Sequence, residues 1–122
     1  MQNKAEPTTT YRALVGRLLA IQREAIGLDQ GALAKKLNMS QSAWSRIETG
    51  QSNLSVDQLS LVAQALKTRP EAILKQAEGA RTQLLRRGVK VLSAADEAEN
   101  AGLFILGAAA LGALLLALSK GK

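Results

Sequence analysis

Residues 30–47, QGALAKKLNMSQSAWSRI, carry the pattern that most restricts the fold of this chain. Two helices joined by a tight turn can lock together if their facing positions are apolar, their crossing point is small and the turn accepts a left-handed residue. Seven positions meet these conditions, and Asn38 meets its condition less easily than glycine would. They are the apolar Leu33, Leu37, Met39, Trp44 and Ile47, the small Ala34, and the turn residue Asn38.

Helical signals surround this pair throughout residues 11–77. Asp29 and Ser40 are suitable N-caps for the two helices of the pair. The segment Ser55-Val-Asp-Gln58 is a capping box for a fourth helix, and Pro70 suits the first turn of a fifth. The sequence therefore predicts an all-α fold with five short helices by about residue 77, and an exposed second helix in the central pair, which is a DNA-reading arrangement.

The words RLLAIQREAIGLDQGALAKKLNMSQSAWSRIETGQSNLSVDQLSLVAQAL carry a resemblance to a known family. Residues 11–77 resemble the Xre/Cro-type helix-turn-helix family of phage repressors and bacterial regulators. The resemblance implies a compact five-helix domain that binds double-stranded DNA and regulates transcription. We expect such a regulator to bind as a homodimer, whose two-fold symmetry requires a pseudo-palindromic operator with half-sites about one helical turn apart.

The resemblance assigns DNA contacts residue by residue. The positions that resemble the family's base-contacting residues, on the outward face of the third helix, are Gln41, Ser42, Ser45 and Arg46. Their chemistry agrees, since glutamine pairs with adenine, arginine with guanine and serine with either. The positions that resemble phosphate-contacting residues are Gln30, Thr49, Gln51 and Ser52. Lys35 is a further candidate, which either contacts a phosphate or is an ordinary solvated side chain.

Other positions of the resemblance have structural roles. Arg23 and Glu48 match a family ion pair that ties the first helix to the end of the third, and we interpret both as scaffold. Trp44 is larger than the usual valine or isoleucine, and we expect it in the core rather than stacked on a base. Ala34 and Asn38 serve the helix crossing and the turn.

Residues 101–118, AGLFILGAAALGALLLAL, are apolar on every side. As a helix they would be about 27 Å long, close to the roughly 30 Å of a bilayer's hydrocarbon core. We expect a transmembrane anchor, followed by a basic tail at 119–122. The alternative is a buried hairpin or an oligomer core. Ahead of this segment we expect a flexible arm at 1–10 and a largely helical linker at 78–100.

Composition excludes several classes of function. The net charge of +6 and the pI near 10.1 indicate a polyanionic partner. The chain has no cysteine and no histidine, which removes thiolate metal sites and the commonest general base. We find no pattern typical of an enzyme, and expect no metal and no cofactor.

The sequence leaves three functional hypotheses. The first is a sequence-specific DNA-binding regulator anchored in the inner membrane, with its DNA-binding domain in the cytoplasm. The second is a soluble Xre-type regulator or antitoxin whose apolar tail mediates oligomerisation or binds a protein partner, as the linker could also do. The third is a small membrane or envelope-assembly protein that uses the helical domain for protein contacts.

Overall fold

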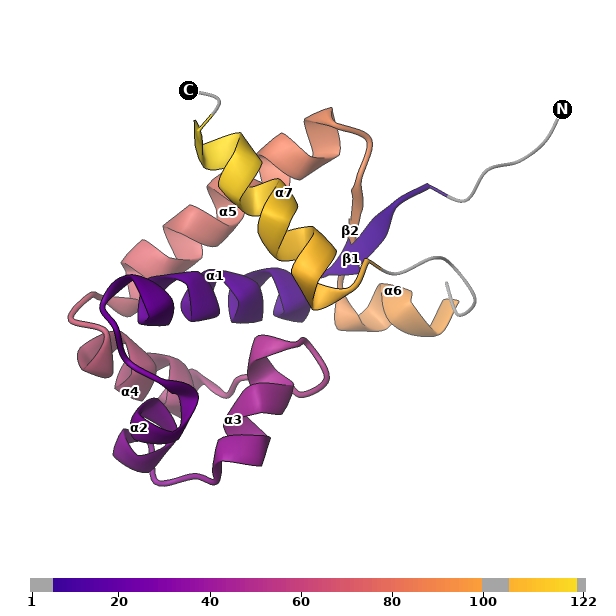
Figure 1. Ribbon diagram of the computed structural model, residues 1–122. Coiled ribbons are helices and arrows are strands. Elements are labelled where there is room, and N and C mark those ends of the chain that lie inside the picture. The colour runs from indigo at the N-terminus through magenta and orange to yellow at the C-terminus, as the bar shows by residue number, and fades with distance from the viewer. Residues whose placement is uncertain (1–5, 100–105, 121–122) are drawn as a thin grey trace, which may run out of the picture.

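The computed structural model describes residues 6–99 and 106–120. Within these residues the chain forms seven helices and two short strands (Figure 1). In chain order the elements are β1 (Thr8–Thr10), α1 (Tyr11–Ala25), α2 (Gln30–Lys36), α3 (Gln41–Glu48), α4 (Val56–Ala65), α5 (Pro70–Arg86), β2 (Lys90–Leu92), α6 (Ala94–Glu99) and α7 (Ala108–Lys120).

The first helices begin where the sequence predicts. The side chains of Asp29 and Ser40 accept hydrogen bonds from the third backbone N–H of α2 and of α3. Ser55 and Gln58 form both hydrogen bonds of the capping box at the start of α4. Pro70 occupies the first turn of α5, where its missing N–H costs no helical hydrogen bond. Local side-chain chemistry therefore sets these boundaries.

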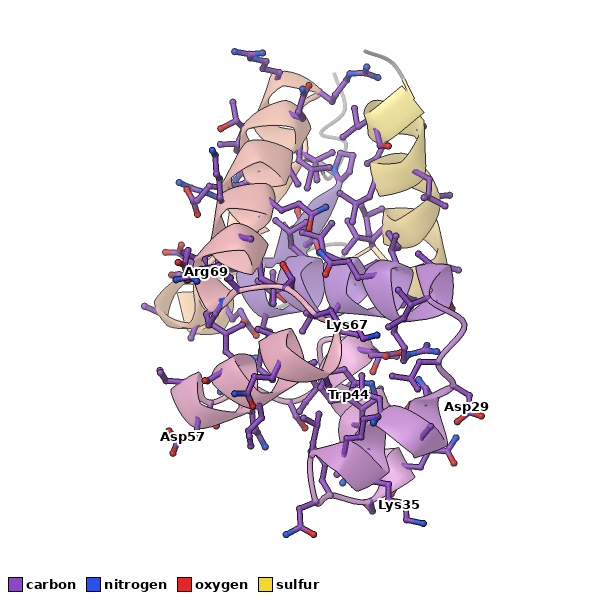
Figure 2. All side chains as sticks on the ribbon, turned by 90° about the vertical axis from the view of Figure 1, so that its left-hand side faces the viewer. Asp29, Lys35, Trp44, Asp57, Lys67 and Arg69 are labelled. Atoms are coloured by element: carbon purple, nitrogen blue, oxygen red, sulfur yellow. The ribbon has the colours of Figure 1, made fainter. Side chains whose placement is uncertain are left out.

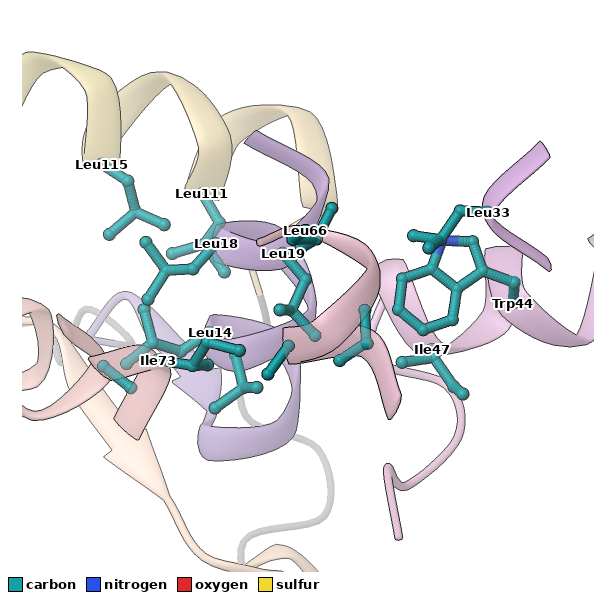
Figure 3. Close-up of a cluster of buried hydrophobic side chains, with 14 of the residues drawn as sticks. Leu14, Leu18, Leu19, Leu33, Trp44, Ile47, Leu66, Ile73, Leu111 and Leu115 are labelled. Carbon is teal, nitrogen blue, oxygen red and sulfur yellow. The ribbon is translucent and has the colours of Figure 1, made fainter. Parts of the chain in front are cut away.

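Helix α1 is the centre of the core. Figure 1 shows it between α2 and α3 on one side and α5 and α7 on the other. Its Leu14 and Leu19 are fully buried, as is Ile73 of α5. A second group of buried side chains, which includes Trp44, lies between α2 and α3 (Figure 3). The two groups belong to one continuous core, so the helix-turn-helix pair rests on α1.

The apolar C-terminal segment is folded onto the domain, which differs from the expected membrane anchor. Helix α7 buries Leu111, Leu115 and Leu118 to 7% exposure or less. Figure 3 shows Leu111 and Leu115 beside Leu18 of α1. Of residues 6–99 and 106–120, no helix is long and apolar enough to cross a membrane. A spacing of four and then three residues explains the docking, because it places these leucines on one helical face.

Two short strands correct the prediction of an all-α fold. Residues 8–10, expected in a flexible arm, form the buried strand β1, which pairs in parallel with β2 (Lys90–Leu92). The backbone N–H of Leu106 also donates to the carbonyl of Thr8 at 2.7 Å, so the apolar segment is attached to the same strand at Leu106. Threonine and valine suit extended backbone because they are β-branched.

The expected linker at 78–100 is also largely folded into the domain. Helix α5 continues to Arg86, and Gly88 follows just beyond its C-cap with a φ of 80°, which suits glycine. Strand β2 and helix α6 follow. Residues 1–5 of the arm, 100–105 at the linker–tail junction and 121–122 of the basic tail lie outside the described residues, while Ser119 and Lys120 belong to α7.

Candidate nucleic-acid interface

The turn between α2 and α3 has the geometry that the sequence predicts. Asn38 adopts a φ of 60°, in the left-handed region. This conformation lets the N–H of Met39 donate to the carbonyl of Ala34 at 3.0 Å, which closes the end of α2. Ser40 then caps α3. The turn is therefore held by a backbone hydrogen bond at the end of α2 and by the side-chain cap of Ser40 at the start of α3.

The apolar lock between the two helices is also confirmed. Leu33 and Trp44 are fully buried, and Ala34, Leu37 and Ile47 are nearly so. Met39 is only partly buried at the edge of the same cluster. Trp44 is a core residue, as predicted, and its labelled position inside the domain is visible in Figure 2.

Burial of this face of α3 leaves the opposite face in solvent. Gln41, Ser42 and Arg46 are exposed and Ser45 is half-buried. These are the four positions predicted to contact bases, and the structure places them together along one helix. Helix α3 lies on the side of the molecule away from α7 (Figure 1). A duplex could therefore approach α3 without meeting the C-terminal helix.

Glu48, at the end of α3, is the centre of a buried polar network. Its carboxylate accepts from Arg23 Nε at 2.6 Å and from Arg23 Nη2 at 3.0 Å. The Trp44 indole N–H donates to the same carboxylate at 2.5 Å. Arg23 Nη1 also donates to the carbonyl of Leu28 at 2.8 Å. The network joins α1, α3 and the segment before α2, which is the scaffold role expected of Arg23 and Glu48.

The network keeps Glu48 ionised although its side chain is 1% exposed. Burial by itself would raise the pKa of Glu48, because it disfavours the charged form. Hydrogen bonds from Arg23, Gln30 and Trp44 outweigh that cost and lower the pKa below the ordinary value of 4.5. The hydrogen bond to Glu48 also raises the pKa of Arg23, because it exceeds the opposing effect of burial.

Gln30 is the first residue of α2, as predicted, and its contact with a phosphate stays a prediction. The residue is half-buried, and its side-chain amide donates to Glu48 Oε1 at 2.7 Å. A glutamine amide has two N–H donors, so one remains for a phosphate oxygen. Gln30 shares this oxygen with Arg23, because Glu48 Oε1 also accepts from Arg23 Nη2, while Oε2 accepts from Arg23 Nε and Trp44.

The residues around and after α3 are placed as follows. Lys35 and Gln51 are exposed, Thr49 is exposed at the end of α3, and Ser52 is half-buried. The hydroxyl of Thr49 donates to the carbonyl of Ser45 at 3.1 Å and accepts from the amide of Gln51 at 3.1 Å. The backbone N–H groups of Gln51 and Ser52 both donate to the carbonyl of Arg46. This segment is thus ordered beside the exposed face of α3.

Two residues of α1 that position α3 were missed by sequence reasoning. A methyl group on Gly16 would overlap the carbonyl oxygen of Ile47, so glycine is needed for the close approach of α1 and α3. Arg12 Nε donates to the carbonyl of Gly50 at 2.7 Å, just beyond α3. The available signal was a glycine inside the helical pattern ALVGRLLA, which usually has a packing reason.

Comparisons with known proteins agree with this geometry. Residues 14–76 match the helix-turn-helix domain family. The clp gene regulator ClgR from Corynebacterium glutamicum has a similar structure, with a TM-score of 0.61 and 25% identity over 63% of this chain and 82% of ClgR. Comparison with curated proteins found no match.

Two weaker likenesses have a TM-score below 0.5. The restriction-modification controller protein C.AhdI from Aeromonas hydrophila is 31% identical over 50% of this chain and 92% of its own, with a TM-score of 0.48. Hydroxypropylphosphonic acid epoxidase from S. wedmorenis is 29% identical with a TM-score of 0.49, and only 35% of that chain is covered. The family match spans residues 14–76 of the 122, more than half of the chain, and this protein therefore belongs to the helix-turn-helix domain family, as a DNA-binding regulator of the Xre type.

Proposed function

We propose that this protein binds double-stranded DNA sequence-specifically and regulates transcription, with α3 as the helix that enters the major groove. The observation that carries the proposal is a row of polar residues on a helix whose other face is packed into the core. The row consists of the exposed Gln41, Ser42 and Arg46 and the half-buried Ser45. Side chains on a rigid helix can reach base edges in a fixed register. Arg46 would discriminate guanine, and Gln41 would discriminate adenine.

Phosphate contacts would fix the position of the domain on the duplex. We assign these to Lys35, Thr49, Gln51 and Ser52, which lie on either side of α3 and are exposed or half-buried. Gln30 joins them only through the amide hydrogen that Glu48 does not hold. The net charge of +6 would attract the duplex at long range without reading its sequence.

We infer that the protein binds as a homodimer. One α3 helix reads only a few base pairs, and two copies related by a two-fold axis would read two half-sites about 34 Å apart on one face of the duplex. ClgR regulates clp genes, and its structural likeness to this chain favours a role in gene control here.

The C-terminal helix belongs to the folded domain in this proposal. The side chains of Leu111, Leu115 and Leu118 are buried by contacts within the chain, whereas Leu116 is 48% exposed on the outer face of α7. That outer face favours the second hypothesis from the sequence, in which the tail contributes to oligomerisation or binds a protein partner. Sedimentation of Leu116→Lys beside the unaltered chain would test this role, because a contact through this face should weaken.

In vitro selection from a pool of random duplexes tests the main proposal. The full chain should enrich one motif with two related half-sites, and its affinity for that motif should fall steeply with salt. If no motif is enriched and no salt-dependent binding is found, the protein does not read DNA, and the helical domain would serve protein contacts instead.

A further inference from the structure

A groove lies beside the end of α3, on a part of the domain that the DNA-binding proposal does not use. It is bounded by α1, the end of α3 and the segment to α4, the first turn of α4, α5 and α6, and its volume is about 370 Å³. Sites for small molecules typically have volumes of roughly 300–1,000 Å³. Its apolar walls come from Val15, Ile47, Leu54, Val56, Leu59 and Leu74.

The groove has one pair of charged side chains among the described residues that line it, Arg12 and Glu97. Arg12 Nη2 and Glu97 Oε1 are 3.0 Å apart, and the two side chains are 30% and 27% exposed. An ion pair between partly exposed side chains is weak, so another carboxylate can replace one partner at small cost.

The two charges are not held equally. Arg12 is anchored on the 15-residue helix α1, and its Nε donates to the carbonyl of Gly50 at 2.7 Å. Glu97 lies on the six-residue helix α6, at the edge of the domain. The fixed charge of the groove is therefore positive. A guanidinium has five N–H donors in a planar fork, and a carboxylate is the group that matches this fork.

We propose that the groove binds a small monocarboxylate with an apolar chain, whose carboxylate takes the place of Glu97 beside Arg12 while its chain lies against the apolar walls. A bound acid would thus contact the residues that hold the end of α3. The proposal concerns a separate site, so DNA binding and acid binding can succeed or fail independently.

The probe is octanoate, which is titrated into the full chain. Its binding is followed by calorimetry and by the NMR signal of the Arg12 side-chain Nε–H. The controls are acetate, which has the charge without the chain, and 1-octanol, which has the chain without the charge. We expect octanoate to bind and to shift the Arg12 signal, and both controls to bind at least roughly tenfold more weakly. 1-Octanol lacks the charge-assisted hydrogen bond, which contributes about that factor, and acetate lacks the apolar chain whose burial stabilises the complex.

Two variants give opposite expected results. Arg12→Gln should weaken octanoate binding roughly tenfold or more, whereas Glu97→Gln should strengthen it because the competing carboxylate is gone. Arg69→Gln and Glu71→Gln remove the same charges from an ion pair at the start of α5 whose side chains are 77% and 66% exposed, outside the groove. Figure 2 labels Arg69. These matched variants should leave octanoate binding unchanged.

Several results would overturn the proposal. One is the absence of octanoate binding at millimolar concentration by the folded chain. Another is equal binding of 1-octanol, which would show an apolar surface only, and a third is an affinity that Arg12→Gln and Glu97→Gln leave unaltered. If the methyl signals of the groove change with protein dilution and not with octanoate, a second copy of the chain occupies the groove instead.

Discussion

Replacement of Leu111 by alanine tests whether α7 is part of the folded domain. Leu111 is 1% exposed and lies against α1, as Figure 3 shows. Leu116 lies on the same helix but is 48% exposed. Leu116→Ala is therefore a matched control, because it removes the same atoms and makes the same change in helix propensity. The two substitutions differ only in the contacts that they remove.

The expected magnitude follows from burial. Leucine-to-alanine changes in protein cores cost about 2–5 kcal/mol. Helix α7 lies at the surface of the domain, where neighbouring side chains can close part of the cavity that the substitution leaves. We therefore expect Leu111→Ala to lower the free energy of unfolding by about 2–3 kcal/mol. Within a single chain, an exposed side chain changes stability by about 0.5 kcal/mol or less, which is the expectation for Leu116→Ala in dilute protein, where contacts between copies do not contribute.

Urea unfolding followed by circular dichroism measures both effects. The midpoint for Leu111→Ala should fall well below that of Leu116→Ala, which should stay close to the unaltered chain. If α7 detaches before the rest of the domain unfolds, the slope of the free energy of unfolding against urea should also decrease, because less surface is buried in the starting state. Equal midpoints for the two variants would refute the docking of α7.

Three further predictions concern the DNA-binding half of the chain. Gly16→Ala should destabilise the fold by about 1–3 kcal/mol in urea unfolding, because its methyl group meets the backbone of Ile47; an unchanged midpoint would contradict the close approach. Because the pKa of Glu48 is lower in the folded chain than in the unfolded chain, its carboxylate stabilises the fold at pH values above the unfolded pKa near 4.5. This contribution is lost as the pH falls through the folded pKa. The stability difference between the chain and Glu48→Gln should therefore shrink in thermal melts below about pH 4.5, and a constant difference would be evidence against an ionised Glu48. Asn38→Val should lower the free energy of unfolding by about 1–3 kcal/mol, because valine rarely adopts a positive φ, whereas Asn38→Gly should not destabilise the turn. Similar melting temperatures for the two variants would count against the left-handed conformation.

Sequence reasoning was most successful where a residue acts on its own neighbourhood. Asp29, Ser40 and Ser55 accept hydrogen bonds from N–H groups three residues later, so the spacing alone indicates where each helix begins. Ala34 and Asn38 were predictable for a similar reason, because one turn geometry requires a small residue and a left-handed residue at fixed positions.

The sequence was least informative where distant segments meet. Strands β1 and β2 have three residues each and pair across about eighty intervening positions, and three-residue runs carry no periodicity. The apolar tail posed a different problem. Because its residues are apolar on all sides, composition could not show that Leu111, Leu115 and Leu118 would meet α1 and α5 instead of lipid.

The candidate site divides in the same way. The exposed face of α3 follows from the buried face by helical geometry, so Gln41 and Arg46 could be placed from the sequence. The roles of Gln30 and Arg12 could not, because each depends on an acceptor from another element. Gln30 donates to Glu48, and Arg12 donates to the backbone of Gly50. The base and phosphate contacts themselves stay predictions.

The most direct test of DNA reading by α3 is the specificity ratio of Arg46→Ala. The ratio compares affinity for the selected duplex with affinity for a scrambled duplex at one salt concentration. Loss of one arginine–guanine contact should reduce this ratio roughly 5–150-fold, which corresponds to about 1–3 kcal/mol of binding free energy. The free energy of unfolding should change little. Arg69→Ala, which removes the same charge at the start of α5, should keep the ratio. A folded Arg46→Ala variant with the full ratio would contradict the assignment of α3 as the recognition helix.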